Sequence, residues 1–153
     1  MDIIVRPARP LDALAIRDIG ICYYLENCRE TLHTLAPKIA AGYCQVAEIG
    51  SYVVGYLLAV PAEARALPLG TCAYSQPKKP TCLYLNTLCV AVRFQGLGVG
   101  SQLVARAVQS SPYNILSVLA LNNSERFWAK QGFQPLRELN YFNQRGVHME
   151  LVK

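Results

Sequence analysis

The sequence lacks the charge pattern of a nucleic-acid-binding protein and the ligand spacing of a metal site. Its 15 lysines and arginines against 10 acidic residues give a net charge of only +5, and no basic run is longer than Lys78-Lys79. Such dispersed charge argues against nucleic acid as a partner and suits a small polyanionic ligand. The six cysteines form no C-x-x-C pair, and only His33 and His148 are available to complete a zinc site. We therefore expect no metal.

Long apolar segments are also missing. The longest, from Tyr52 to Ala62, contains glycine and proline and is well short of the roughly 20 residues that a membrane span requires. The N-terminus reaches Arg6 after one short apolar patch, unlike a secretory signal. Cysteines without disulfide or zinc spacing are expected to be reduced thiols. These features predict a cytoplasmic protein that does not enter a membrane, and 153 residues with 52% hydrophobic content favour a single domain over residues 1–153.

The first 80 residues alternate between helical and strand periodicity. A short strand, an amphipathic helix and a second helix stopped by Gly42 are followed by two strands that Gly50-Ser51 joins as a hairpin. Residues 61–80 contain five prolines and glycines and are predicted to form one long irregular loop. The predicted elements are a strand at Ile3–Val5, helices at Leu11–Cys22 and Arg29–Ala41, and strands at Tyr43–Ile49 and Tyr52–Val60.

The second half of the chain contains the strongest strand pattern, Thr81 to Val92, which is apolar on both faces as expected for the middle of a covered sheet. A helix over Ser101–Gln109 and a strand over Ile115–Leu121 complete a βαβ unit, so these two strands should be parallel. Asn122 or Asn123, with Glu125, is predicted to cap a helix that Gly132 stops, and a final strand is predicted at Val147–Val152.

The turn Gln95-Gly96-Leu97-Gly98-Val99-Gly100 lies between the predicted central strand and the helix that follows it. The N-terminus of a helix has N–H groups without partners and a positive dipole end. Glycines let a phosphate approach that backbone closely, because they carry no Cβ. The turn therefore predicts a pyrophosphate-binding site.

Three segments in order resemble the GNAT superfamily of N-acetyltransferases. Gln95-Gly96-x-Gly98-x-Gly100 matches that family's Gln/Arg-x-x-Gly-x-Gly/Ala signature, and Leu85 to Val90 looks like its central strand. Asn123 with Phe127 to Phe133 is similar to its later helix ending in Gly-Phe. The resemblance implies an α/β (α+β mixed) fold. Its central mixed sheet is mostly antiparallel, with one parallel βαβ unit at a splayed strand pair and helices on both faces.

The resemblance also implies that the protein binds acetyl-CoA and transfers the acetyl group to an amine of a small molecule, an amino acid or a protein. The pyrophosphate would lie on the amides of residues 96–101, and the pantetheine would pair with the backbone of Leu88, Cys89 and Val90. Surrounding basic side chains would add charge near the phosphates. The implied cofactor-binding residues are Leu88, Cys89, Val90, Gln95, Gly96, Leu97, Gly98, Val99, Gly100, Ser101, Asn123, Phe127, Trp128 and Lys130.

The catalytic positions depart from the family pattern. Asn86 occupies the strand position where many members carry a glutamate base, and Trp128 occupies the helix position where many carry a tyrosine acid. Asn86 cannot accept a proton but can hold a water. Cys89 or Val90 would offer a backbone N–H to the oxyanion, while a nucleophilic Cys89 is disfavoured by its apolar neighbours. Alternative bases are Glu26, Glu30, Glu48 and His33, and alternative acids are Tyr84 and Tyr141.

Two other functions remain open at this point. The missing glutamate and tyrosine also fit a non-catalytic module that binds or senses acyl-CoA. A dinucleotide-binding domain is the weaker alternative, because the G-x-G-x-x-G order is absent. The acceptor wall is expected from residues 22–34, the loop 61–80 and the segment around Tyr141, and a homodimer is possible.

Overall fold

The computed structural model describes residues 2–21, 30–66 and 76–153 of the chain. Seven strands of the described residues form one sheet in the order β1-β2-β3-β4-β5-β7-β6. Every neighbouring pair is antiparallel except β4 and β5, which are parallel. The strands are β1 (Ile4–Pro7), β2 (Cys44–Ile49), β3 (Tyr52–Ala62), β4 (Cys82–Val90), β5 (Ile115–Ala120), β6 (Gln134–Tyr141) and β7 (Gln144–Val152). The predicted mixed sheet with one parallel pair is confirmed.

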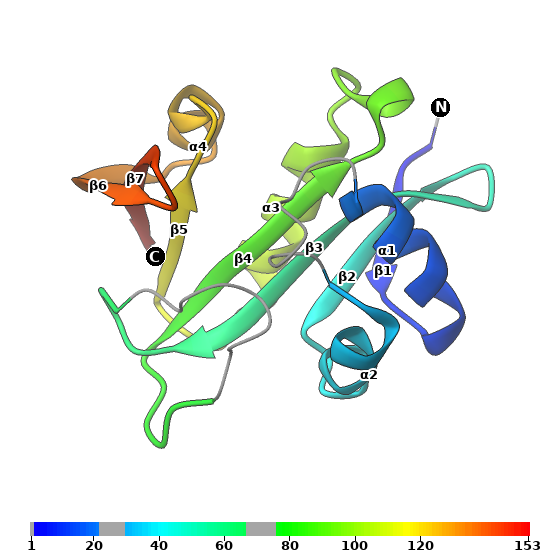
Figure 1. Ribbon diagram of the computed structural model, residues 1–153, viewed down its shortest axis with the longest axis horizontal. Coiled ribbons are helices and arrows are strands. Elements are labelled where there is room, and N and C mark those ends of the chain that lie inside the picture. The colour runs from blue at the N-terminus through cyan, green and yellow to red at the C-terminus, as the bar shows by residue number, and fades with distance from the viewer. Residues whose placement is uncertain (1, 22–29, 67–75) are drawn as a thin grey trace.

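Helices cover both faces of the sheet, as Figure 1 shows. One face carries the 3-10 turn η1 (Pro10–Asp12), α1 (Ala13–Ile21) and α2 (Leu32–Ala40); the other carries α3 (Val99–Ser110) and α4 (Glu125–Lys130). Buried Ile16 and Leu35 pack with Tyr56 of β3 on the first face, and Leu103 and Trp128 belong to the larger cluster on the second. The sheet is thus the middle of three layers, with apolar contacts on each side.

The hairpin predicted at Gly50-Ser51 is confirmed. Gly50 has φ 55° and Ser51 has φ 73°, and a two-residue turn with both residues at positive φ matches the right-handed twist of its strands. β3 continues to Ala62, paired with β4. Pro61 and Ala62 therefore belong to the strand rather than to the predicted loop, of which residues 67–75 lie outside the described residues.

The C-terminal third differs from the prediction in two places. β6 was not predicted, although it pairs with β7 along its length. The predicted asparagine cap of α4 is wrong, because Asn122 and Asn123 both lie at positive φ and Ser124 occupies the N-cap with no side-chain hydrogen bond. The predicted stop is confirmed: Gly132 has φ 101°, and the backbone N–H of Phe133 donates to the carbonyl of Trp128 at 3.1 Å.

The parallel strands β4 and β5 are paired over only a short length, and their separation beyond it makes room for the site. Pairing between β4 and β5 runs from Cys82 and Ile115 to Leu85 and Val118. Beyond that point the two strands separate as a V in Figure 1. Asn86 is the extra residue of a bulge in β4, because Leu85 pairs with Ala59 of β3 and Thr87 with Leu58. A bulge bends its strand and increases the local twist, so it lies where β4 turns away from β5.

Candidate active site

A cavity of about 1140 Å³ opens where β4 and β5 diverge. Its walls come from the second half of β4, the glycine turn, the start of α3, the end of β5, α4 and the β6–β7 turn. The described residues that line it are Tyr84–Val90, Phe94, Gln95, Gly96, Gly98–Ser101, Val118, Leu119, Leu121, Asn122, Ser124, Phe127, Trp128, Tyr141, Phe142 and Gln144. The cavity lies beyond the carboxyl ends of the parallel strands, where open α/β sheets bind ligands.

The glycine turn forms one end of the cavity and leads directly into α3. Gly96 has φ 78° and Gly98 has φ 87°, and a Cβ built on either residue would meet no other atom within 4 Å. Gly98 is the N-cap, so α3 begins at Val99, two residues before the predicted start at Ser101. The first turn of α3 has no acidic residue. An anion therefore meets open space, backbone N–H groups and the positive end of a helix of 12 residues.

Side chains on either side of the turn hold its geometry. The amide nitrogen of Gln95 donates to the carbonyl of Val90 at 3.2 Å, which ties the turn to the end of β4. Gln131 donates to the hydroxyl of Ser101 at 3.1 Å and so links the end of α4 to the start of α3. A Cβ on Gly100 would lie 3.4 Å from the ring of Phe127. Gly100 thus serves close packing of the two helices.

The comparison with family models decides what this architecture is. The model described as the acetyltransferase (GNAT) domain matches residues 40–135, which is more than half of the chain. The protein belongs to the GNAT acetyltransferase family. The resemblance carried by the glycine turn, the central strand and the Gly-Phe helix end is confirmed, and this GNAT protein is an enzyme of the acetyltransferase class.

Solved structures share the fold at low sequence identity. A GNAT-family acetyltransferase from Bacillus cereus has a TM-score of 0.77 at 14% identity and covers 100% of this chain and 99% of its own. A Mycobacterium tuberculosis protein in complex with CoA has a TM-score of 0.75 at 19% identity, with 98% and 99% covered. The NatC complex bound to Gag peptide and CoA contains a chain with a TM-score of 0.76 at 14% identity, with 100% and 99% covered. No curated protein matches the sequence.

Most of the residues expected to hold the cosubstrate lie together around the cavity of this GNAT protein. Leu97, Asn123 and Lys130 are the exceptions and lie outside the lining set. Leu97 is 47% exposed in the turn, and Lys130 is exposed in the last turn of α4. Trp128, in contrast, is only 6% exposed and packs edge-on against Phe127 and Phe133. It is a core residue whose surface also reaches the cavity.

Two polar side chains at the β4 bulge line the cavity without a protein partner. The amide nitrogen of Asn86 and the hydroxyl of Thr87 are buried, and neither makes a hydrogen bond within the protein. Thr87 is 3% exposed. Burying an unpaired polar group costs about 1–3 kcal/mol, and nothing within the protein compensates that cost at these two atoms. Sequence reasoning identified Asn86 but missed Thr87, whose neighbouring position in the bulge brings it to the same wall.

Cys89 lies on β4 among apolar side chains. It is 4% exposed and belongs to the cluster that contains Ile16, Leu35 and Tyr56. Cys44 in the same cluster is a free thiol whose pKa burial raises to about 12. Cys89 is thus a packed residue of an apolar layer that also reaches the cavity, and its packing supports the expectation that it is not a nucleophile.

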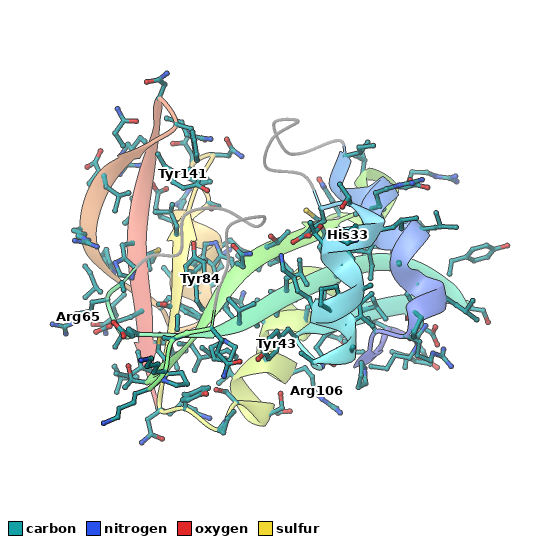
Figure 2. The ribbon with its side chains drawn as sticks, turned by 60° about the horizontal axis from the view of Figure 1, so that its bottom comes forward. His33, Tyr43, Arg65, Tyr84, Arg106 and Tyr141 are labelled. Carbon is teal, nitrogen blue, oxygen red and sulfur yellow. The ribbon has the colours of Figure 1, made fainter. Side chains whose placement is uncertain are left out.

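Two tyrosines occupy the end of the cavity toward the β6–β7 turn. Tyr84 and Tyr141 both line it, and Figure 2 shows them on the same side of the molecule. Burial, with a smaller contribution from Tyr141, raises the pKa of the Tyr84 phenol well above its usual range. Tyr84 therefore keeps its proton throughout the neutral and mildly alkaline range. Tyr141 packs edge-on against Phe142 with ring centroids 4.7 Å apart.

The alternative bases named from the sequence lie elsewhere, as far as they are described. Glu30 pairs with buried Lys38 and accepts from Thr34, and Glu48 pairs with Arg6 at 3.2 Å. His33 lies exposed on α2 and apart from the tyrosines in Figure 2. Glu26 lies outside the described residues. Among the described residues, those that line the cavity include no carboxylate and no imidazole, and no cluster of three or more metal-ligating side chains occurs. None of the described helices is long and apolar enough to cross a membrane.

Proposed function

We propose that this acetyltransferase carries the acetyl group of acetyl-CoA to a primary amine by direct attack, with residues 1–153 acting as one acyltransferase domain. The observation that carries the proposal is the single cavity that joins the glycine turn to the divergence of β4 and β5. A long donor with a phosphate at one end and a thioester at the other matches a cavity that runs from the glycine turn to the point where β4 and β5 separate. The two structural neighbours with CoA in their complexes support a CoA-type donor.

The donor would be held mainly by backbone groups. Its pyrophosphate would lie on the amides from Gly96 to Ser101, where positive φ at Gly96 and Gly98 leaves the approach open. Its pantetheine amides would pair with the backbone of Leu88 to Val90, beyond the last pair of the parallel ladder. Lys130 and Asn123, outside the cavity wall, would contribute at most charge and hydrogen bonds around the exposed phosphates.

Asn86 and Thr87 would hold the water that moves the proton. In the reaction a C–N bond forms, the C–S bond breaks, and the amine loses one proton while the leaving sulfur can gain one. The reaction therefore balances without a protein base if a water passes the proton from nitrogen to sulfur. A buried hydroxyl and a buried amide without protein partners, on the same wall, suit such a water, since each ordered water needs two or more polar partners.

The remaining expected catalytic residues take smaller parts. The backbone N–H of Cys89 or Val90 would stabilise the charge that develops on the carbonyl oxygen, and the thiol of Cys89 would only pack. Tyr84, which stays protonated, and Tyr141 would lie on the acceptor side. A coenzyme thiol resembles a cysteine in acidity, near pH 8.5, so it leaves partly as thiolate and needs little help from an acid.

The test combines binding with turnover. Calorimetry with purified protein should show a complex with acetyl-CoA, and a thiol-release assay should show turnover with at least one amine of a broad panel. Binding without thiol release from any amine would instead support the acyl-CoA-sensing alternative, which the missing carboxylate on the described cavity wall favours. Failure to bind acetyl-CoA would refute the donor site itself.

A further inference from the structure

His148 of β7 is an ionisable side chain buried without a partner. Its exposed fraction is 0%, and neither Nδ1 nor Nε2 makes a hydrogen bond with the part of the chain that the structure describes. A neutral imidazole has one N–H donor and one acceptor nitrogen, so both lose their hydration without replacement. Burial of a charged group costs much more than burial of a neutral polar one. The closed fold therefore accommodates His148 as the neutral ring.

The charged groups around this ring do not favour its protonation. Arg137 lies opposite His148 in the pairing of β6 with β7. Glu150, two residues further along β7, bonds to Arg65 at 3.4 Å, and Arg137 donates to the carbonyl oxygen of Arg65 at 3.3 Å. Two cations thus act on the imidazole beside one anion that already has a partner. Burial, with smaller contributions from Arg137 and Arg65, lowers the pKa of His148, and Glu150 opposes the shift only in part.

The neighbouring strands add no charge on this face of the sheet. His148 pairs with Leu119 of β5, and the pairing of β5 with β4 continues the same face. The side chains that β4 and β5 place on it are Cys82, Tyr84, Ser117 and Leu119. Burial raises the pKa of both Cys82 and Tyr84, so both stay protonated and uncharged. Residues 67–75, outside the described residues, include none that is charged at neutral pH.

The hairpin of β6 and β7 can open while the rest of the sheet stays paired. β7 and β6 are the last two strands in the sheet order, and only β7 of the two is paired with β5. Figure 1 shows them at one end of the molecule. β6 is almost entirely exposed along its length. Elements at the periphery of a fold open at a lower free energy than the whole domain, and this opening is the step that exposes His148.

The cavity depends on that hairpin. Tyr141, Phe142 and Gln144 of the hairpin line the cavity, as does Leu119, which pairs with His148. When β7 separates from β5, the cavity loses the wall that these residues form. A proton taken up at His148 is thus coupled to the shape of the active-site cavity, although the ring itself lies outside the lining.

We propose that His148 makes the contact between β7 and β5 acid-sensitive, so that below about pH 6.5 proton uptake favours an open form without the hairpin wall. The sign follows from linkage. The exposed ring of the open form binds a proton near pH 6.5, whereas the buried ring of the closed form resists it. Closure is therefore fully stable above that pH, and the opening constant rises by up to about tenfold for each pH unit below it.

Hydrogen exchange tests the proposal on the full chain. Protection factors, which correct for the intrinsic pH dependence of exchange, are compared at pH 7.5 and pH 5.0 in wild type and in His148→Leu, which has a similar volume and no nitrogen. The opening constant of amides in β6 and β7 should rise about tenfold or more in wild type and much less in His148→Leu. Amides of β2 and β3 should change little. An equal rise in both proteins, or in all strands, would overturn the proposal.

His33 supplies the matched control. It is the other histidine of the sequence and is exposed on α2, so His33→Gln should follow the wild type in exchange at both pH values. Wild-type acid sensitivity that disappears in His33→Gln would assign the effect to the wrong histidine and overturn the proposal.

A titration that keeps His148 in place covers the case in which His148→Leu does not fold. In His33→Gln the imidazole NMR signals belong to His148 alone. At pH 6.5, where a solvated histidine is half protonated, they should report a neutral ring, and a half-protonated or charged ring would overturn the proposal. None of these measurements needs turnover, so their outcome is independent of the proposed acetyl transfer.

Discussion

Thr87 allows the proposed proton path to be separated from the stability of the fold. Thr87 lines the cavity, its hydroxyl is buried without a protein partner, and only 3% of the residue is exposed. Valine has the same shape without the hydroxyl, and serine keeps the hydroxyl without the methyl group. The two substitutions should therefore move stability and rate in opposite directions.

The expected changes in stability follow from burial. Removing an unpartnered buried hydroxyl relieves a penalty of about 1–3 kcal/mol, and a water in the cavity offsets part of it. Thr87→Val should then gain about 1 kcal/mol, which corresponds to about 2–4 °C in Tm for a chain of this size. Thr87→Ser loses one buried methyl group, and its free energy of unfolding should fall by about 1 kcal/mol.

The expected rates have the reverse order. Thr87→Ser should turn over at close to the wild-type rate, since the water keeps both polar partners. Thr87→Val should lose about 100-fold in kcat, within the range typical of positioned proton transfer, while KM for acetyl-CoA stays the same. Circular-dichroism melts and thiol release measure the two quantities. Wild-type turnover in Thr87→Val, or a joint loss of rate and stability, would refute the reasoning.

Three further predictions concern the donor site, the thiol and the proton. Gly98→Glu should abolish calorimetric binding of acetyl-CoA, because it puts bulk and negative charge at the N-cap of α3 and a Cβ on a residue with φ 87°; unchanged affinity would exclude the pyrophosphate from this turn. Cys89→Ala should stay active and form no acetylated enzyme detectable by mass spectrometry, whereas complete loss of thiol release in a folded variant would indicate a covalent mechanism. Without a protein base, the midpoint of kcat/KM against pH should follow the acceptor, near pH 8 for a peptide N-terminus and near pH 10.4 for an alkylamine. Rates would rise about tenfold per pH unit below each midpoint, and one shared midpoint would assign the proton to a group of the protein.

The glycine turn at the end of the cavity could be predicted because its determinants are local in sequence. Glycines at the start of a helix, after a strand of apolar residues, are visible as a pattern, and Gly96 and Gly98 do adopt the positive φ that only glycine takes easily. The hairpin at Gly50-Ser51 was predictable for the same reason. Each depends on a few adjacent residues whose conformational preference agrees with the fold.

The cavity wall around Tyr141 was expected from the sequence, but the strand and turn that form it could not be predicted, because these elements lack those signals. β6 is almost entirely exposed, so it shows no alternation of apolar and polar residues, and its turn into β7 contains Phe142 where a glycine would have marked a hairpin. Thr87 reaches the cavity through a bulge at Asn86, and strict alternation along β4 cannot anticipate an extra residue. The predicted cap of α4 was wrong because Asn122 and Asn123 adopt the left-handed backbone conformation, which asparagine also accepts.

Pairing between β4 and β5 stops at Leu85 and Val118. The rest of β4 therefore has no neighbouring strand on that side and forms an edge inside the sheet. From Asn86 to Leu88, β4 keeps β3 on one side and faces the cavity on the other. Peptide groups are the same in every residue, so this edge can be recognised by any extended molecule with amides at strand spacing. Short synthetic amide chains that imitate a neighbouring strand should thus make inhibitors of this enzyme, and side-chain substitutions along β4 would offer little escape from them.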